Sequence, residues 1–238
     1  MTCHKPWSLP FSRRSPLSLQ NLMEEPLMIE VYAFATPNSV KVTIALEELD
    51  LAYALHGINI RQGEQGTTAF TTLNPNQKVP VLVDHDARDE KLVLTESAAI
   101  LVYLAEKTGR LLPATGAERA RVFEQLFFHA SALSPAFGQS GFFQRFASEK
   151  LPLAIERFDK EAKRVLHVLD TLLAHRDFVA GDHFTIADIA HFGWLWRRSF
   201  PGLTLDDTPH IARWYERIAA RPGVQRGIAR VETLAAPN

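Results

Sequence analysis

The 238 residues have the composition of an ordinary globular protein, with 46% hydrophobic side chains available for a core. This length allows one long domain or two short ones. A formal net charge of −1 and the lack of a basic stripe argue against nucleic acid and against an anionic membrane as partners. No apolar run approaches the ~20 residues of a membrane span. Cys3 is the only cysteine, so no internal disulfide can form, which suits a reducing compartment such as the cytoplasm.

Residues 1–27 differ in character from the rest of the chain. They are rich in proline and serine, and they lack both a clean apolar segment and an Ala-x-Ala cleavage pattern, so no secretory signal is expected. We expect a disordered extension, or an upstream start codon with Met28 as the functional start. A targeting peptide is the alternative, supported only by Lys5, Arg13 and Arg14.

Residues 28–113 predict a small mixed sheet with helices. Alternating apolar side chains indicate strands, and apolar side chains at i, i+3, i+4 and i+7 indicate an amphipathic helix. A polar loop with Gly63 and Gly66 and a turn at 74–76 interrupt the pattern. The order β-α-β, connector, β-β-α is the thioredoxin-like arrangement. The expected strands are 28–34, 54–60, 79–83 and 91–94, and the expected helices are 42–49 and 96–107.

Strand patterns stop after residue 113, and residues 117–235 predict an all-helical second domain. Thr185 and Asp188 are spaced as a capping box, with Phe184 and Ile189 as its hydrophobic staple, a feature that we assign to folding. Residues 137–146 are interpreted as the connection between the first two helices. The expected helices are 118–133, 152–174, 185–198, 209–220 and 224–234.

The most informative motif is Pro80, which opens an apolar strand. Proline has no N–H and cannot serve a central ladder, so it indicates a turn here, often with a cis peptide bond. The N–H and C=O of Val79 would then be free to pair with a peptide-like ligand. Glu96 and Ser97 follow at the start of an apolar helix, and helix N-termini bind carboxylates. One small peptide could span both features.

Together these features resemble the soluble glutathione transferases over about residues 28–235. The resemblance implies that residues 28–113 bind glutathione near the junction with the helical domain, with one site per subunit of a homodimer. Three segments are similar to the bacterial nu class, whose members reduce disulfides with glutathione. These segments are Ala35-Thr36-Pro37-Asn38, Asn74-Pro75-Asn76-Gln77-Lys78-Val79-Pro80 and Ile155-Glu156-Arg157-Phe158.

Two groups of residues would hold the γ-glutamyl and cysteinyl units of glutathione. Ser97 would donate its hydroxyl and N–H to the γ-glutamyl carboxylate, helped by the helix dipole. Glu96 would accept the γ-glutamyl ammonium or hold the turn. Val79, before Pro80, would exchange two backbone hydrogen bonds with the cysteinyl unit.

Three further residues are expected at the ligand, each with a plain surface residue as the alternative. Lys78 could reach the glycyl carboxylate. The resemblance places Gln65, in the loop with two glycines, on the ligand. It also matches Arg157 to an arginine that reaches a glutathione carboxylate from the helical domain.

Thr36 and Asn38 are the expected catalytic residues, because they lie where the first strand turns into the first helix. Their side-chain donors and the positive end of the helix would stabilise the thiolate of bound glutathione, whose thiol is mostly protonated at neutral pH. The alternative is that Asn38 caps the helix and Thr36 shapes the turn. This turn carries no cysteine or tyrosine, so disulfide reduction would need thiols from bound glutathione, either two reduced molecules or one oxidised molecule.

An electrophile pocket is expected beside the sulfur, lined by Phe142, Phe143 and Phe146, with ordinary core packing as the alternative. The nine histidines form no His-x-His or His-x-x-x-His pair, so no metal is expected.

The sequence thus predicts a nu-type glutathione transferase that reduces small disulfides, with transferase or peroxidase side activity. One alternative is a transferase that conjugates glutathione to hydrophobic electrophiles without significant disulfide reduction. The other is a non-enzymatic binding module with the same fold.

Overall fold

The computed structural model describes residues 29–87 and 90–235, so the expectations for residues 1–27 and for a start at Met28 lie outside it. The first part of the chain forms a four-stranded sheet in the order β2-β1-β3-β4. β1 (Ile29–Ala33) pairs in parallel with β2 (Ala54–Gly57) and antiparallel with β3 (Val81–Ala87). β3 in turn pairs antiparallel with β4 (Glu90–Leu94). The predicted thioredoxin-like arrangement is therefore confirmed.

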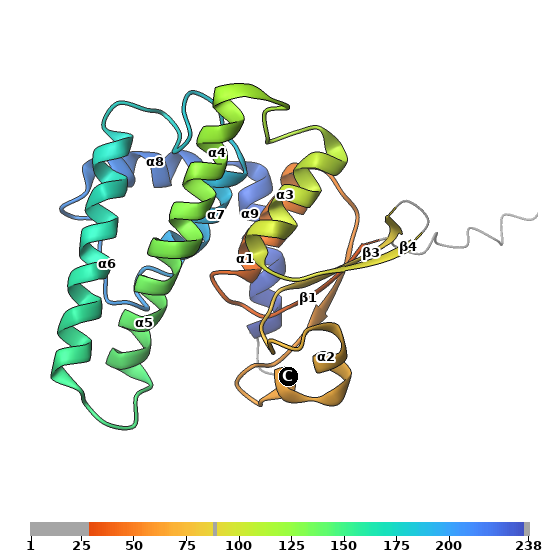
Figure 1. The fold of residues 1–238 in the computed structure, drawn as a ribbon, viewed down its shortest axis with the longest axis horizontal. Helices are drawn as coiled ribbons and strands as arrows, with labels where there is room; N and C mark the ends of the chain where they lie inside the picture. The colour runs from red at the N-terminus through yellow and green to blue at the C-terminus, as the bar shows by residue number, and fades with distance from the viewer. Residues whose placement is uncertain (1–28, 88–89, 236–238) are drawn as a thin grey trace, which may run out of the picture.

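Helices cover both faces of this sheet (Figure 1). α1 (Ser39–Glu48) and α3 (Ser97–Thr108) bury their apolar side chains in the main core, together with Val31 of β1. On the opposite face, α2 (Thr68–Leu73) places Phe70 in a small cluster with Val81. The sequence did not predict α2, because a helix of this length with one buried residue shows no periodic apolar pattern.

The second part of the chain is helical, as predicted. α4 (Gly116–Phe128) runs through a π-helical turn at His129–Leu133 into α5 (Ser134–Arg145). One short 3-10 turn lies in the first part of the chain, at Glu64–Gly66, and another follows the last helix, at Thr233–Ala235. None of the helices in the described residues is long and apolar enough to cross a membrane. The remaining helices are α6 (Pro152–Leu173), α7 (Ile186–Trp196), α8 (Pro209–Ala219) and α9 (Pro222–Glu232).

The interpretation of residues 137–146 as a connection was wrong, since most of them belong to α5. Gly141 in this helix serves close packing, whereas Gly138 leaves room for ordinary contact. A Cβ on Gly141 would lie 2.1 Å from Cε1 of Phe200, and a Cβ on Gly138 would lie 3.6 Å from the Trp194 ring. A helix tolerates glycine where a neighbouring ring needs the space of the missing side chain.

The capping box at the start of α7 is confirmed. The Thr185 N–H donates to Oδ2 of Asp188 at 2.9 Å, and the buried Asp188 also accepts hydrogen bonds from the Val179 N–H and the Trp214 indole. This carboxylate therefore joins the start of α7 to α8 and to the preceding loop.

The C-terminal helix returns to the sheet-bearing part of the chain (Figure 1). α9 packs along α1, where the Thr43 hydroxyl donates to the Gly227 carbonyl at 2.8 Å. A Cβ on Gly227 would lie 2.6 Å from the backbone nitrogen of Ile44, so only glycine allows this approach. The ion pair between Glu48 and Arg221 adds to the same contact.

Candidate functional site

An open cavity of about 280 Å³ lies between the loop that precedes β3, the start of α3 and the π-helical turn. Residues from both parts of the chain line it, as expected for a site at their junction. Six residues that the sequence singled out meet here: Asn38, Lys78, Val79, Pro80, Glu96 and Ser97. Six others were not singled out for a site: Lys41, Asn74, Ala98, His129, Ala130 and Ser134.

The loop before β3 presents its backbone to the cavity. The Val79–Pro80 peptide bond is cis, as the sequence suggested. Within the described residues, neither the N–H nor the C=O of Val79 has a hydrogen-bond partner. The buried Asn74 supports this loop, because its amide donates to the Lys78 carbonyl at 2.7 Å while its Oδ1 accepts the Asn76 N–H at 3.0 Å. A supported loop with free backbone groups can pair with one extended peptide unit.

The start of α3 supplies the second polar wall. Glu96 precedes the helix with φ of +65°, a conformation that costs energy in a residue other than glycine and that occurs often at functional sites. The first N–H groups of α3, beginning with that of Ser97, have no partner within the helix and carry the positive end of its dipole. This terminus is suited to a carboxylate.

Thr36 and Asn38 separate in the structure. The Thr36 hydroxyl accepts the Ser39 N–H at 3.1 Å and lies 3.0 Å from the Ser39 hydroxyl, so Thr36 caps the first turn of α1. It does not line the cavity. Asn38 makes no cap hydrogen bond, which corrects the alternative that it caps α1. Its side chain instead lines the cavity, because Thr36 already satisfies the exposed N–H.

Lys41 is the main residue that sequence reasoning missed. It is 1% exposed, and its Nζ lies 2.7 Å from Oδ1 of Asn38, 3.3 Å from the Ser97 hydroxyl and 2.7 Å from Nε2 of His129. Burial lowers the pKa of Lys41 to about 7, although the charge of Glu96 raises it. The only signal in the sequence was its position three residues after Asn38, and a helical lysine is normally solvated.

Two buried, neutral histidines pack against each other near Lys41, and one of them, His129, lines the cavity. Burial and the charge of Lys41 lower the pKa of His129 well below its usual value. Burial lowers the pKa of His191 to about 3, and the rings of the two histidines pack edge to face with centroids 5.1 Å apart. His129 opens the π-helical turn, a distortion that is frequent at functional sites. The described residues hold no group of three or more side chains suited to a metal ion.

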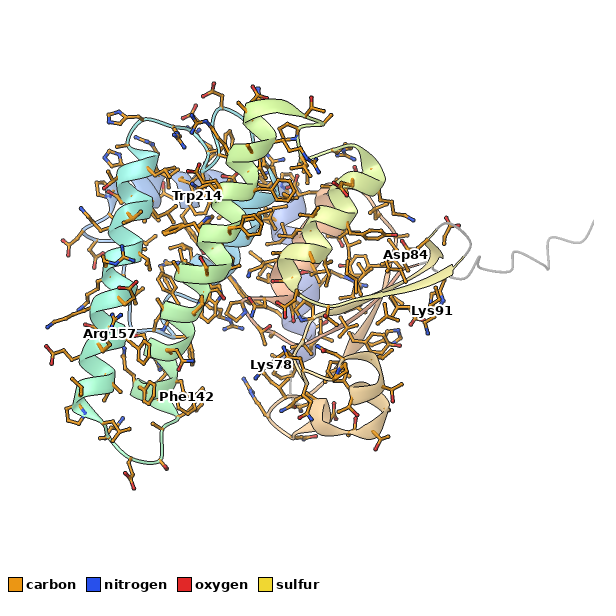
Figure 2. The ribbon with its side chains drawn as sticks, in the orientation of Figure 1. Lys78, Asp84, Lys91, Phe142, Arg157 and Trp214 are labelled. Atoms are coloured by element: carbon orange, nitrogen blue, oxygen red, sulfur yellow. The ribbon has the colours of Figure 1, made fainter. Side chains whose placement is uncertain are left out.

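Besides Thr36, five predicted residues lie outside the set that lines the cavity. Figure 2 shows Arg157 on α6 and Phe142 on α5, in the helical part, whereas Lys78 lies on the loop before β3. Arg157 is exposed and pairs with Glu161 on its own helix. Phe142 and Phe146 are largely exposed, and Phe143 stacks on Phe158 with centroids 5.4 Å apart.

Gln65 also lies outside the lining set. It follows Glu64 in the short 3-10 turn, and its Oε1 is buried without a hydrogen-bond partner in the described residues. An unpaired buried amide oxygen is unfavourable, so a hydrogen-bond donor from a ligand would stabilise the Gln65 side chain.

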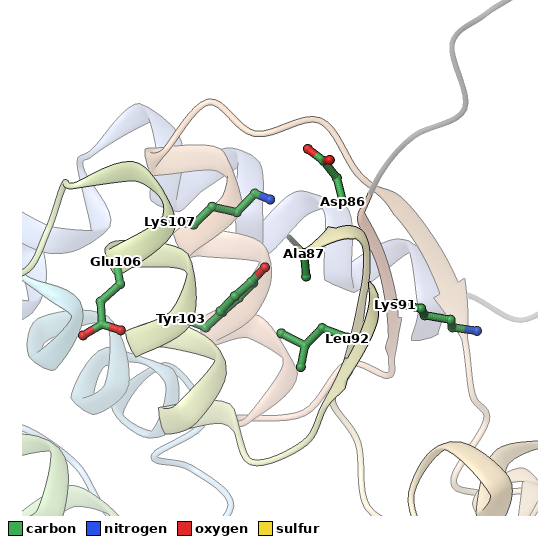
Figure 3. Close-up of a pocket in the computed structure, with 7 residues that line it drawn as sticks. All are labelled: Asp86, Ala87, Lys91, Leu92, Tyr103, Glu106 and Lys107. Carbon is green, nitrogen blue, oxygen red and sulfur yellow. The ribbon is translucent and has the colours of Figure 1, made fainter. Parts of the chain in front are cut away.

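A larger hollow of about 610 Å³ lies elsewhere, between α3 and the far ends of β3 and β4 (Figure 3). Two of its polar groups, Lys107 and the Tyr103 hydroxyl, already bind the buried Asp84, at 2.9 and 2.7 Å. None of the sequence-predicted site residues lines this hollow. Its lining comprises Asp86, Ala87, Lys91, Leu92, Tyr103, Glu106 and Lys107.

Comparison with known proteins agrees with the geometry. A model described as "Glutathione S-transferase, N-terminal domain" matches residues 35–107, and one described as "Glutathione S-transferase, C-terminal domain" matches residues 128–222. The chain is 38% identical over 209 residues to the disulfide-bond oxidoreductase YfcG of Escherichia coli strain K12. The matched residues make up 86% of this chain and 96% of that protein.

Two crystal structures are similar over most of their length. A glutathione transferase family member from Pseudomonas fluorescens Pf-5, with two glutathione bound, has a TM-score of 0.81 and 39% identity over 86% of this chain and 94% of that one. A glutathione transferase from Pseudomonas putida, with one glutathione disulfide bound per subunit, has a TM-score of 0.79 and 36% identity over 86% and 92% of the two chains. The chain therefore belongs to the glutathione S-transferase superfamily, as its motifs indicated.

Proposed function

We propose that this protein binds glutathione in the cavity at the start of α3 and uses its thiolate to reduce small disulfides. The observation that carries the proposal is the convergence of Asn38, the free backbone of Val79 and the Glu96-Ser97 helix start on one cavity. These groups come from three separate segments, and each matches a different part of one tripeptide. The names of the relatives from Escherichia coli and the two Pseudomonas species support the same ligand and reaction.

Each part of glutathione has a complementary group. The γ-glutamyl carboxylate binds Ser97 and the N-terminus of α3, and its ammonium faces Glu96. The cysteinyl unit pairs with the backbone of Val79, which places the sulfur toward Asn38. Lys78 receives the glycyl carboxylate, with Gln65 and Arg157 as further contacts once their side chains turn toward the ligand.

The chemistry is thiol–disulfide exchange. The thiolate of one glutathione attacks a sulfur of the substrate disulfide, which forms a mixed disulfide and releases one substrate thiolate. The thiolate of a second glutathione attacks the glutathione sulfur of this mixed disulfide. The products are glutathione disulfide and the second substrate thiolate, and the two substrate thiolates take up the two protons lost from the two glutathione molecules. Cys3 is the only cysteine, so the protein itself cannot supply a redox pair.

The thiolate must be stabilised for this reaction, because a free thiol has a pKa of roughly 8.5. The Asn38 amide and the start of α1 provide hydrogen-bond donors and a positive dipole at that place. We propose that Thr36 contributes by holding the turn that positions Asn38.

A homodimer and a cytoplasmic location remain parts of this proposal. The homodimer is supported by the similarity of both parts of the chain to glutathione S-transferase domains. Light scattering on a sizing column measures the subunit number directly.

A two-substrate assay tests the function. We expect glutathione-dependent reduction of hydroxyethyl disulfide to exceed conjugation of a chlorodinitrobenzene-type electrophile. The reverse order would support the second candidate, a conjugating transferase, which the exposed rings of Phe142 and Phe146 favour as an apolar surface. Failure to bind glutathione in either redox state would support the non-enzymatic module.

A further inference from the structure

We propose that Lys41 is a positioning residue of the glutathione site, whose buried ammonium orients Asn38 and Ser97 and takes up a proton when the anionic ligand binds. This inference rests on the proposed function and adds a proton-linked group to it. Lys41 was not among the expected ligand contacts, and it approaches the cavity from within the protein.

The hydrogen bonds around Lys41 fit an ammonium. Its three N–H groups have three partners, which are Oδ1 of Asn38, the hydroxyl of Ser97 and Nε2 of His129. His129 can accept this bond only with its proton on Nδ1. The three surrounding groups thus accept all three N–H donors of a buried ammonium.

This arrangement decides which way the Asn38 amide faces. An ammonium only donates, so the Asn38 atom beside Nζ must be the acceptor Oδ1, and the two N–H donors of Nδ2 face away from Lys41. Asn38 lines the cavity, so these donors are available to the glutathione sulfur. Without Lys41 the amide could flip and present an oxygen, which would repel a thiolate.

The same ammonium orients Ser97. The Ser97 oxygen accepts from Lys41 at 3.3 Å, which leaves its own O–H to donate to the ligand carboxylate. One cation therefore sets the donor direction at two places that bind opposite ends of the γ-glutamylcysteine unit.

Close packing keeps Lys41 in place. A Cβ on Gly193 of α7 would lie 2.7 Å from Cγ of Lys41 and 2.4 Å from the Pro37 carbonyl, so α7 presses directly on the lysine stem. The Nζ has no room to leave the cavity floor, because the side chain is completely enclosed.

The charges around Lys41 make its protonation sensitive to the ligand. Glu96 from the start of α3 favours the ammonium, whereas burial opposes it, so the ammonium and the free amine are balanced near neutral pH in the empty protein. His129 from the π-helical turn and His191 from α7 face it as neutral rings. Lys78 lines the same cavity. A carboxylate bound at Ser97 would add a negative charge that favours the ammonium, whether or not the ligand also carries a thiolate.

The affinity for the ligand should depend on pH. A ligand that favours protonated Lys41 binds more tightly at low pH, where the ammonium is already present. Each unit by which the ligand raises this pKa corresponds to a tenfold difference in affinity between the protonated and neutral protein. Affinity should therefore fall as pH rises from about 6.5 to 8, and binding near neutral pH should consume protons.

Calorimetric titration of the full-length protein with S-methylglutathione tests this. The ligand has no thiol, so its cysteinyl unit exchanges no proton. Its α-ammonium titrates near the upper end of this pH range, but that contribution is common to the wild type and to Lys41→Met, so the difference between the two proteins reports Lys41. Titrations in phosphate and in Tris, whose ionisation enthalpies differ, give the number of protons taken up. We expect the wild type to take up a substantial fraction of one proton more at pH 7.5 than Lys41→Met, whose shape is similar.

Lys41→Met should also bind about tenfold more weakly than the wild type at pH 6.5, with the difference shrinking toward pH 8. Lys41→Gln, which can still hydrogen-bond, is expected to show the same loss of proton uptake if the Met variant does not fold. Lys163→Met is the matched control, because it removes an exposed lysine on α6, outside the cavity, and should leave both the affinity and the proton uptake unchanged.

The possible failures are distinguishable. Binding of S-methylglutathione by the wild type without proton uptake would overturn the role of Lys41 alone. If Lys41→Met or Lys41→Gln takes up as many protons on binding as the wild type does, the role of Lys41 is overturned as well. No binding of S-methylglutathione or glutathione at any pH would overturn the proposed function as well.

Discussion

Oδ1 of Asn38 lies 2.7 Å from Nζ of Lys41, one turn further along α1. The residue that we expect to act on the thiol is therefore itself held by a buried cation, and Thr36 alone caps the helix. In our proposal, three residues at the start of α1 have different roles. Thr36 satisfies the backbone, Lys41 orients the Asn38 amide, and Asn38 offers its N–H groups to the ligand.

Asn38→Ala should impair turnover more than glutathione binding. The variant loses a donor to the thiolate but keeps the contacts to both ends of the tripeptide. We expect the pKa of the bound thiol to rise by about one unit, or ~1.4 kcal/mol. The ultraviolet absorbance of the bound thiolate as a function of pH measures this shift. An unchanged titration curve would remove Asn38 from the catalytic role.

Ser97→Ala should have the opposite pattern. A hydrogen bond to a charged carboxylate contributes roughly 1.5–3 kcal/mol, so glutathione affinity should fall by about tenfold or more. Turnover at saturating glutathione should stay close to the wild-type value. Calorimetry and steady-state kinetics give the two quantities. A fall in kcat without a change in affinity would contradict the assignment.

Thr36→Val should mainly destabilise the protein. The substitution keeps the shape of the side chain and removes the oxygen that accepts the Ser39 N–H, which costs about 1 kcal/mol for a typical N-cap. Thr36→Ser should restore most of the loss in urea unfolding. A large loss of kcat in the Val variant with unchanged stability would instead place the Thr36 hydroxyl at the sulfur.

Lys41 should make the stability of the ligand-free protein depend on pH. Burial lowers its folded-state pKa to about 7, below the usual 10.5, so the unfolded chain binds more protons between these values. Stability should therefore rise with pH from about 7 to 10.5, by up to ~1.4 kcal/mol per pH unit from this group. Urea unfolding at pH 7.5 and 9 measures it, and Lys41→Met should lack this increment. Equal pH slopes in both proteins would show that Lys41 keeps its proton.

Gly227→Ala should weaken the contact between α9 and α1. The new Cβ would lie 2.6 Å from the Ile44 backbone, and overpacking of this kind costs typically 1–3 kcal/mol. Gly66→Ala is the control, because its Cβ would have nothing closer than Gln77 at 3.9 Å. Thermal unfolding compares the two, and equal stabilities would mean that α9 can move away at no cost.

Local sequence patterns determined most of the secondary structure and half of the candidate site. Apolar periodicity indicated α6 and α8, because long amphipathic helices repeat their pattern many times. Pro80 indicated the turn before β3, since a missing N–H has a local consequence. The same local reasoning failed for α5, which was interpreted as a connection, and whose Gly141 packs against the distant ring of Phe200.

The tertiary structure alone decided how polar groups are paired inside the protein. Lys41 and His129 are 88 positions apart, and no spacing rule connects them. Burial turns an ordinary helical lysine into a titratable group near neutral pH, because the free energy of its charge depends on everything packed around it. The sequence alone therefore determined most of the elements and the turn at Pro80 that leaves the Val79 backbone free. Only the packed fold determined which side chains control those groups, because desolvation and hydrogen-bond partners come from segments far away in the chain.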